Sequence, residues 1–269
     1  MTIRITTPVS HLFAESVAAR ALSDLSDALE LRDDSPKVSL PPTLSMLYHC
    51  EQSIVRPLDF DQLQRVVDPL LRQERLLLVS LHALSCYEVP PIADGMFRPV
   101  GRRMERTEML HTVHRNVETL SRMYGTDVTI AIENNNYYPT GAYDIVTEAS
   151  FISELVRTTR TSLLLDVAHA RISAHNMGIG PEAHLTQLPL EHAIQIHLSG
   201  FATNEPVWRD SHAELSEEQW RDAESCLRRL PDVQFVTLEY YRKADVLIQM
   251  LTNLRILLNE GTNKTTGGC

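Results

Sequence analysis

The residues best suited to chemistry in this sequence are acids and histidines that directly follow short apolar segments. Leu163–Leu165 is followed at once by Asp166, and His169 stands three residues further on. A run of leucines is typical of a strand buried on both faces, as in a parallel sheet. A carboxylate at the end of such a strand is costly unless a metal ion or a hydrogen-bond partner meets it. Asp166 and His169 therefore mark a candidate site.

The same pattern recurs along the chain. Other apolar segments end in a histidine or a glutamate, and the loop after the segment that ends in His197 adds an aspartate and a histidine two positions apart. The full candidate set is His49, His82, Glu133, Asp166, His169, His197, Asp210, His212 and Glu239. Any one of these alone is more often a capping or hydrogen-bonding residue than a ligand. Nine ionisable groups in one cavity, however, could not all be buried unpaired.

The composition of this set indicates the kind of metal. Mixed sets of imidazoles and carboxylates suit zinc, iron or manganese, whereas magnesium and calcium favour oxygen ligands alone. Nine side chains also exceed what one ion needs. The sequence therefore predicts two or three metal ions, with all nine residues as ligands.

Eight apolar segments alternate with helical patterns, which predicts a (β/α)8 TIM barrel. In such a barrel the carboxyl ends of all strands meet at one mouth, which carries the active site. A doubly wound open sheet is the alternative, but its glycine-rich phosphate loop is missing. The expected strands are Ile3–Thr6, Ala28–Leu31, Leu44–Tyr48, Leu76–Leu81, Val128–Ile132, Leu163–Asp166, Ala193–Ile196 and Phe235–Leu238.

The helices are expected between these strands. Their expected ranges are Ser10–Asp27, Phe60–Arg72, Glu105–Tyr124, Ala149–Thr158, a short helix from Pro181, Ser216–Arg229 and Ala244–Leu258. Pro69 should end or kink its helix. The long loop Ser85–Arg103 is typical of a functional lid. Residues 1–260 are thus predicted to form a single TIM-barrel catalytic domain, and residues 261–269 a flexible C-terminal tail.

The composition of the chain indicates which binding partners and which cellular compartment to expect. A formal net charge of −10 argues against a nucleic-acid partner. No apolar run approaches the length of a membrane span, so no membrane partner is expected. The four cysteines are scattered, without a C-x-x-C pair, and no secretory signal precedes the first strand. We therefore expect a cytoplasmic protein.

Four segments of the sequence resemble a known family. They are Leu163–Asn176 (LLLDVAHARISAHN), Gln195–Gly200, Asp210–His212 and Thr237–Glu239. They are similar to the DUF692 family of multinuclear non-heme iron-dependent oxidative enzymes, which includes the methanobactin biosynthesis oxidase. The resemblance extends upstream through Ile132–Asn134, Leu81–His82, Tyr48–His49 and Leu29–Leu31, so it covers nearly the whole barrel.

This resemblance implies a function. Members of the family modify ribosomally made peptides in natural-product biosynthesis, commonly at a cysteine of the precursor peptide. They use two or three iron ions, mixed-valent Fe(II)/Fe(III), together with O2, and a partner protein usually recruits the peptide. By position, the implied iron ligands are His49, His82, Glu133, Asp166, His197, Asp210, His212 and Glu239. The family usually has D-x-x-N after the sixth strand, and here His169 stands in place of that Asn.

Other functions remain open. The Asp-x-x-His pattern resembles endonuclease IV, a barrel with three zinc ions that acts on abasic DNA, although that enzyme carries Asn-Asp-Ser-Lys where this chain has Leu198–Phe201. A xylose isomerase-like sugar epimerase needs only four of the ligands. It would leave His49, His82, Asp210 and His212 without a role. A non-catalytic scaffold would have little reason to keep nine competent ligands. Residues away from the metals favour the iron-dependent oxidase, with zinc as the alternative metal.

Overall fold

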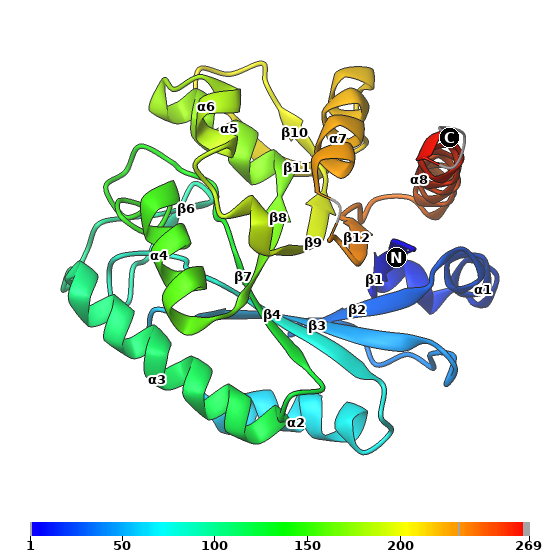
Figure 1. The fold of residues 1–269 in the computed structure, drawn as a ribbon, viewed down its shortest axis with the longest axis horizontal. Coiled ribbons are helices and arrows are strands. Elements are labelled where there is room, and N and C mark those ends of the chain that lie inside the picture. Colours follow the sequence, from blue (N-terminus) through cyan, green and yellow to red (C-terminus); the bar gives the residue numbers. More distant parts are fainter. Residues whose placement is uncertain (1, 231, 266–269) are drawn as a thin grey trace.

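The computed structural model describes residues 2–230 and 232–265. Eight parallel strands close into a barrel with the helices around it (Figure 1). The strands are β1 Arg4–Pro8, β2 Ala28–Arg32, β3 Ser45–Ser53, β4 Leu76–His82, β7 Thr129–Glu133, β8 Ser162–Asp166, β9 Ala193–Leu198 and β12 Phe235–Leu238. Their order around the barrel is β1-β12-β9-β8-β7-β4-β3-β2. The predicted (β/α)8 TIM barrel is confirmed.

The helices follow the predicted alternation with several differences. They are η1 His11–Ala14, α1 Ser16–Leu25, α2 Phe60–Leu71, α3 Arg106–Tyr124, α4 Ala149–Thr159, α5 Val167–Met177, α6 Pro181–Leu185, η2 Leu190–His192, α7 Glu217–Arg229 and α8 Ala244–Thr265. The predicted helix Ser10–Asp27 is divided into a 3-10 turn and a shorter α-helix. Helix α5 was not predicted, and α2 continues two residues past Pro69. Helix α8 continues past Leu258, so its end covers the start of the predicted tail. Residues 266–269 of that tail lie outside the described residues, and the tail stays a prediction.

The alternation of side chains along each strand divides the core in two. Leu164 packs with Leu47, Leu78 and Ala131 in a cluster inside the barrel. Its neighbours Leu163 and Leu165 belong to the larger cluster between the strands and the helices. Because successive side chains of a strand point to opposite faces, the residue two positions after each inner apolar residue also points inward.

Those next inward positions are polar. His49 follows Leu47, Glu133 follows Ala131 and Asp166 follows Leu164, and all three are almost completely buried. The register places them side by side around the barrel, with His82 opposite Glu133 and Asp166 opposite His197. The barrel interior therefore changes from an apolar layer to a layer of acids and histidines toward the carboxyl ends of the strands.

Two hairpins extend from this end of the barrel. The first, β5 Ile92–Ala93 and β6 Met96–Phe97, lies within the loop predicted as a lid. The second, β10 Gly200–Ala202 and β11 Arg209–Ala213, follows β9. Asp94 and Gly95 turn the first hairpin with φ of 52° and 72°, the left-handed conformation that an Asp-Gly hairpin turn needs. Arg209 donates a hydrogen bond to the carbonyl oxygen of Asp94 at 2.9 Å and so connects the two hairpins.

Across residues 2–230 and 232–265, the helices include none that combines the length and the apolar character needed to cross a membrane.

The second hairpin depends on a glycine. A Cβ at Gly200 would lie 2.6 Å from the carbonyl oxygen of Ala213 and would also clash with that of Glu214. We predict that Gly200→Ala lowers the free energy of unfolding by about 1–3 kcal/mol, because the backbone of the neighbouring strand must move. Thermal unfolding measures the effect. Gly180→Ala is the matched control, since its Cβ would meet only the Ala183 Cβ at 3.9 Å. Equal melting temperatures for the two variants would contradict this account.

Candidate metal centre

Glu133 lies at the centre of the polar layer. Its Oε2 is 2.8 Å from His82 Nδ1 and 3.3 Å from His49 Nε2. Its Oε1 is 3.3 Å from His169 Nδ1 and 3.9 Å from His197 Nδ1. One carboxylate thus contacts four imidazoles that come from β3, β4, α5 and β9.

The remaining predicted residues continue this cluster. His169 Nε2 is 3.8 Å from Asp166 Oδ2 and 3.5 Å from Asp210 Oδ2. His212 Nε2 lies 3.1 Å from Asp210 Oδ2 and 3.2 Å from Glu239 Oε2. Glu239 Oε1 in turn lies 3.0 Å from His197 Nδ1. The structure therefore brings all nine residues of the predicted set together in one continuous cluster.

Within this cluster, three groups of side chains could each hold a metal ion. Each group offers three ligand atoms that lie within 4.8 Å of one another. The groups are His49, His82 and Glu133; Glu133, Asp166 and His169; and Glu30, His197 and Glu239. Glu133 belongs to two of them, which is the arrangement expected of a carboxylate that bridges two ions.

The sequence interpretation missed Glu30 as a site residue. Glu30 is completely buried on β2, with Oε2 3.0 Å from His197 Nε2 and 2.6 Å from Gln195 Nε2. The signal was present in the sequence, because Glu30 is a carboxylate within an apolar strand, as Asp166 is. Arg32, two residues on, also points into the cluster and contacts both Glu30 and Glu239.

Two of the histidines have their ring orientation fixed from outside the cluster. His169 Nδ1 lies 3.0 Å from the carbonyl oxygen of Asn134, which can only accept, so Nδ1 donates and Nε2 faces the carboxylates of Asp166 and Asp210. His49 Nδ1 is 2.8 Å from Ser80 Oγ, while its Nε2 faces the cluster. Partners of this kind orient imidazoles that bind metals.

The charges of the cluster depend on one another. Burial alone would raise the pKa of Glu133, but the imidazoles of His82 and His49 lower it well below its usual value. Burial raises the pKa of Asp166 to about 6. Burial also lowers the pKa of His49, and it would lower that of His169 were it not for nearby carboxylates, chiefly Asp166, which raise it well above its usual value.

The hydrogen bonding of the cluster tests whether metal ions fit it. Among the described residues, five buried ligand-type atoms of this cluster make no well-aligned hydrogen bond. Four of them face each other in pairs, His82 Nδ1 with Glu133 Oε2 at 2.8 Å and His197 Nδ1 with Glu239 Oε1 at 3.0 Å, and the fifth is Asp166 Oδ2. Buried polar atoms without partners are rare and costly. Metal ions would satisfy all five at once, so the donor set fits two or three cations.

His212 has an unusual backbone. Its φ of 42° lies in the left-handed region, which a residue other than glycine adopts at a cost. The side chain of Asp210 accepts a hydrogen bond from the His212 N–H at 3.2 Å and helps to hold this conformation. Strain of this kind is concentrated at functional sites.

Comparison with known proteins identifies the family. Residues 53–256 match the model of the RiPP precursor modification enzymes MbnB/TglH/ChrH, where RiPP denotes a ribosomally synthesised and post-translationally modified peptide. The chain belongs to this family. It is thus a member of a family of enzymes whose substrates are precursor peptides.

Curated relatives match over a shorter stretch. A UPF0276 protein of Caulobacter sp. is 36% identical over 116 residues, which is 41% of each chain. A UPF0276 protein of Chromobacterium violaceum is 33% identical over 103 residues, which is 38% of this chain and 37% of that protein. The matched stretch thus spans about two fifths of these relatives.

Solved structures match over nearly the whole chain. A D-tagatose 3-epimerase-like protein has a TM-score of 0.62 with 13% identity, and the match covers 96% of this chain and 99% of that one. A putative xylose isomerase from Rhodospirillum rubrum has a TM-score of 0.59 with 12% identity, covering 95% and 98%. At such low identity these matches show the shared barrel fold alone.

We predict that Glu133→Gln removes at least about one metal ion per chain, because Glu133 contributes to two of the three groups and an amide is a weaker ligand. Elemental analysis of the metal-loaded protein measures the loss. Glu118→Gln, an exposed position on α3, is the control. An unchanged metal content in Glu133→Gln would remove this residue from the centre.

We predict that His169→Asn, which installs the residue usual in the DUF692 family, leaves the protein folded and lowers the affinity for one metal ion by about tenfold or more. The reason is that asparagine lacks the Nε2 atom of His169. In the unaltered protein the hydrogen bond from Nδ1 holds this atom toward the carboxylates. Metal titration followed by calorimetry measures the affinity, with His114→Asn on the exposed face of α3 as the control. Identical titrations for the variant and the unaltered protein would show that His169 is no ligand.

Proposed function

We propose that this protein uses two or three iron ions and O2 to modify a cysteine of a ribosomally made precursor peptide by oxidation. The observation that carries this proposal is the cluster of nine predicted ligands around Glu133 in a chain of the precursor-modifying family. The ligands would be the nine predicted residues together with Glu30. Bound iron would supply a Lewis-acidic site for the substrate thiolate and one-electron chemistry with O2.

The protein's own part is to hold these ligands in a fixed arrangement. Ser80 and the Asn134 carbonyl orient two of the imidazoles. The Asn134 side chain also bonds the backbone of Asp166 in both directions, through Nδ2 to the carbonyl oxygen and through Oδ1 to the N–H, each at 2.9 Å. These bonds tie the ends of β7 and β8 together, so Glu133 and Asp166 keep their spacing.

Aromatic residues beside the centre would exclude water from it. Tyr138 and Tyr143 form a cluster after β7, against which Phe97, Phe201 and Trp208 from the two hairpins pack. Tyr138 Oη accepts a hydrogen bond from the backbone N–H of Asp210 at 3.3 Å, which joins this cover to a predicted ligand. A dry cavity strengthens electrostatic interactions and limits side reactions of activated oxygen.

The proposal is tested with protein that is purified without oxygen and loaded with iron. We expect it to consume O2 in the presence of a Cys-containing precursor peptide and to change the peptide's mass, because the thiolate and O2 meet at the same centre. The same peptide with Ser in place of Cys, and protein loaded with zinc, should give neither signal. Oxygen electrode traces and mass spectra are the readouts.

Two results would contradict the proposal. One is protein that binds zinc only and consumes no O2 with any Cys-containing peptide. The other is cleavage of abasic DNA or epimerisation of a sugar by the zinc-loaded protein, lost in His212→Ala, with no change in any peptide. His192→Ala, a histidine outside the cluster, serves as the control for the loss of an imidazole.

A further inference from the structure

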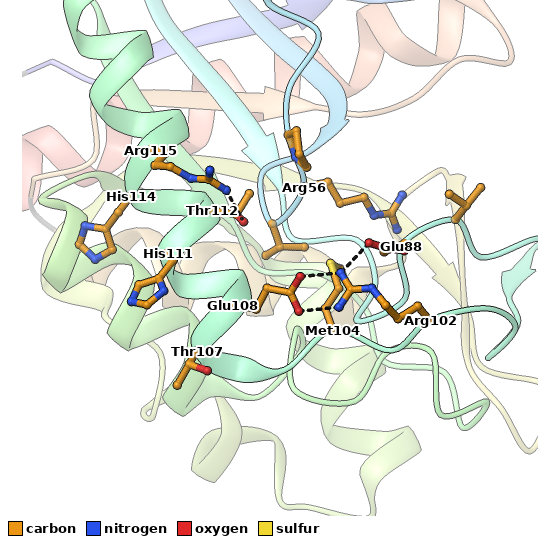
Figure 2. Close-up of a pocket in the computed structure, with 13 residues that line it drawn as sticks. Arg56, Glu88, Arg102, Met104, Thr107, Glu108, His111, Thr112, His114 and Arg115 are labelled. Atoms are coloured by element: carbon orange, nitrogen blue, oxygen red, sulfur yellow. Dashed lines mark hydrogen bonds and ion pairs between the residues drawn. The ribbon is translucent and has the colours of Figure 1, made fainter.

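A groove with a volume of about 1130 Å³ lies beside α3 (Figure 2). Its walls are α3, the loop after β3 and the loop after β4. None of the nine predicted ligands lines it. Its cationic side chains are Arg56, Arg102 and Arg115, with His111 and His114 beside them on α3. We call it the arginine groove.

One of the three arginines is already neutralised. Arg102 Nη1 bonds Glu108 Oε2 at 2.8 Å, and its Nη2 also contacts Glu88, as Figure 2 shows. The two glutamates of the groove are thus engaged by one guanidinium. This network fixes the loop after β4 to the first turn of α3. Among the described residues it leaves Arg115 without an ion pair, and Arg56 interacts with Glu88 only beyond ion-pair distance.

Arg56 and Arg115 have no ion pair among the described residues. Arg115 donates only to Thr112 Oγ1, at 3.4 Å. The Nε and Nη2 of Arg56 are buried without a hydrogen-bond partner, and burial lowers the pKa of this side chain. Nε and Nη2 form one edge of the guanidinium fork, the edge that binds a carboxylate through two parallel bonds. A rotation of this long side chain would present that edge to the groove.

Apart from Thr107 and Thr112, the rest of the lining is apolar. Val55, Pro57, Val89 and Met104 contribute to it, and Val89 is 83% exposed. An exposed valine beside unpaired guanidinium groups suits a ligand that carries apolar and acidic groups next to each other. A concave site of this size suits a single extended segment better than the flat face of a folded partner.

We propose that the arginine groove binds an acidic segment of the precursor peptide, in which carboxylates stand next to apolar residues. This rests on the proposed function, because it takes a peptide to be the substrate. The chain's net charge of −10 repels acidic peptides from most of its surface. Two unpaired arginines in one groove therefore select the place where such a segment binds.

The position of the groove fits this role. The loops that form two of its walls follow β3 and β4, and these strands carry His49 and His82 of the metal centre. A peptide held in the groove thus lies next to the loops around the barrel mouth. The groove holds the acidic segment while a neighbouring segment carries the reacting cysteine to the centre.

Binding is tested by fluorescence anisotropy with a fluorescein-labelled peptide of about twelve residues that alternates Glu and Leu. The protein needs no iron for this measurement. We expect the double variant Arg56→Gln/Arg115→Gln to raise the Kd by about tenfold or more, since two charged hydrogen-bond donors are lost. Arg20→Gln, an exposed arginine on α1, is the matched control and should leave the Kd unchanged. A Gln/Leu peptide should bind the unaltered protein as weakly as the Glu/Leu peptide binds the double variant.

An equal Kd for the double variant and for Arg20→Gln overturns the proposal, provided that melting temperatures show both to be folded. A dimer that dissociates in Arg115→Glu also overturns it, because a second copy would then occupy the groove. If the double variant still modifies a Cys-containing precursor with an unchanged KM, the groove is excluded while the proposed function stands. If the Glu/Leu peptide binds through the arginines but no peptide is oxidised, the groove stands and the proposed function fails.

Discussion

The structure depends on the close contacts between acids and imidazoles that are buried inside the barrel. Glu133 contacts four histidines while it is almost completely shielded from water. Removing any one charge would leave its partners buried and unpaired, which costs far more than the pair itself contributes. Most of the polar groups in this layer therefore have to be kept or lost together.

Much of this cluster was predictable because the side chains of a strand alternate between its two faces, so every second residue points the same way. Once Leu164 is placed inside a barrel, Asp166 must also point inward, and the same holds for Leu47 with His49 and for Ala131 with Glu133. Barrel closure then brings residues together that are more than a hundred positions apart in the chain. Six members of the cluster lie on or directly after barrel strands and follow from this local pattern. The other three, His169 on α5 and Asp210 and His212 on β11, lie outside the barrel strands.

Other features could not be predicted in this way. Helix α5 is buried on most of its sides, so its apolar residues form no single stripe and give no helical period. Glu30 could not be singled out in this way because it lies within its strand, whereas the pattern of an apolar run followed by an acid or histidine marks only strand ends. The pairing of Arg32 with Glu239 is a tertiary contact between β2 and the residue after β12, on either side of β1, which no local pattern encodes.

The hydrogen bond from Arg209 to the Asp94 carbonyl ties together two loops that grow from different strands, with β7 and β8 between them. A residue inserted into either hairpin would carry one end of this bond out of reach. The lengths of the two hairpins are therefore coupled, although 115 positions separate their bonded residues in the chain. In evolution, one of these loops could change its length only if the other did so in step, or if the connection across the mouth were given up.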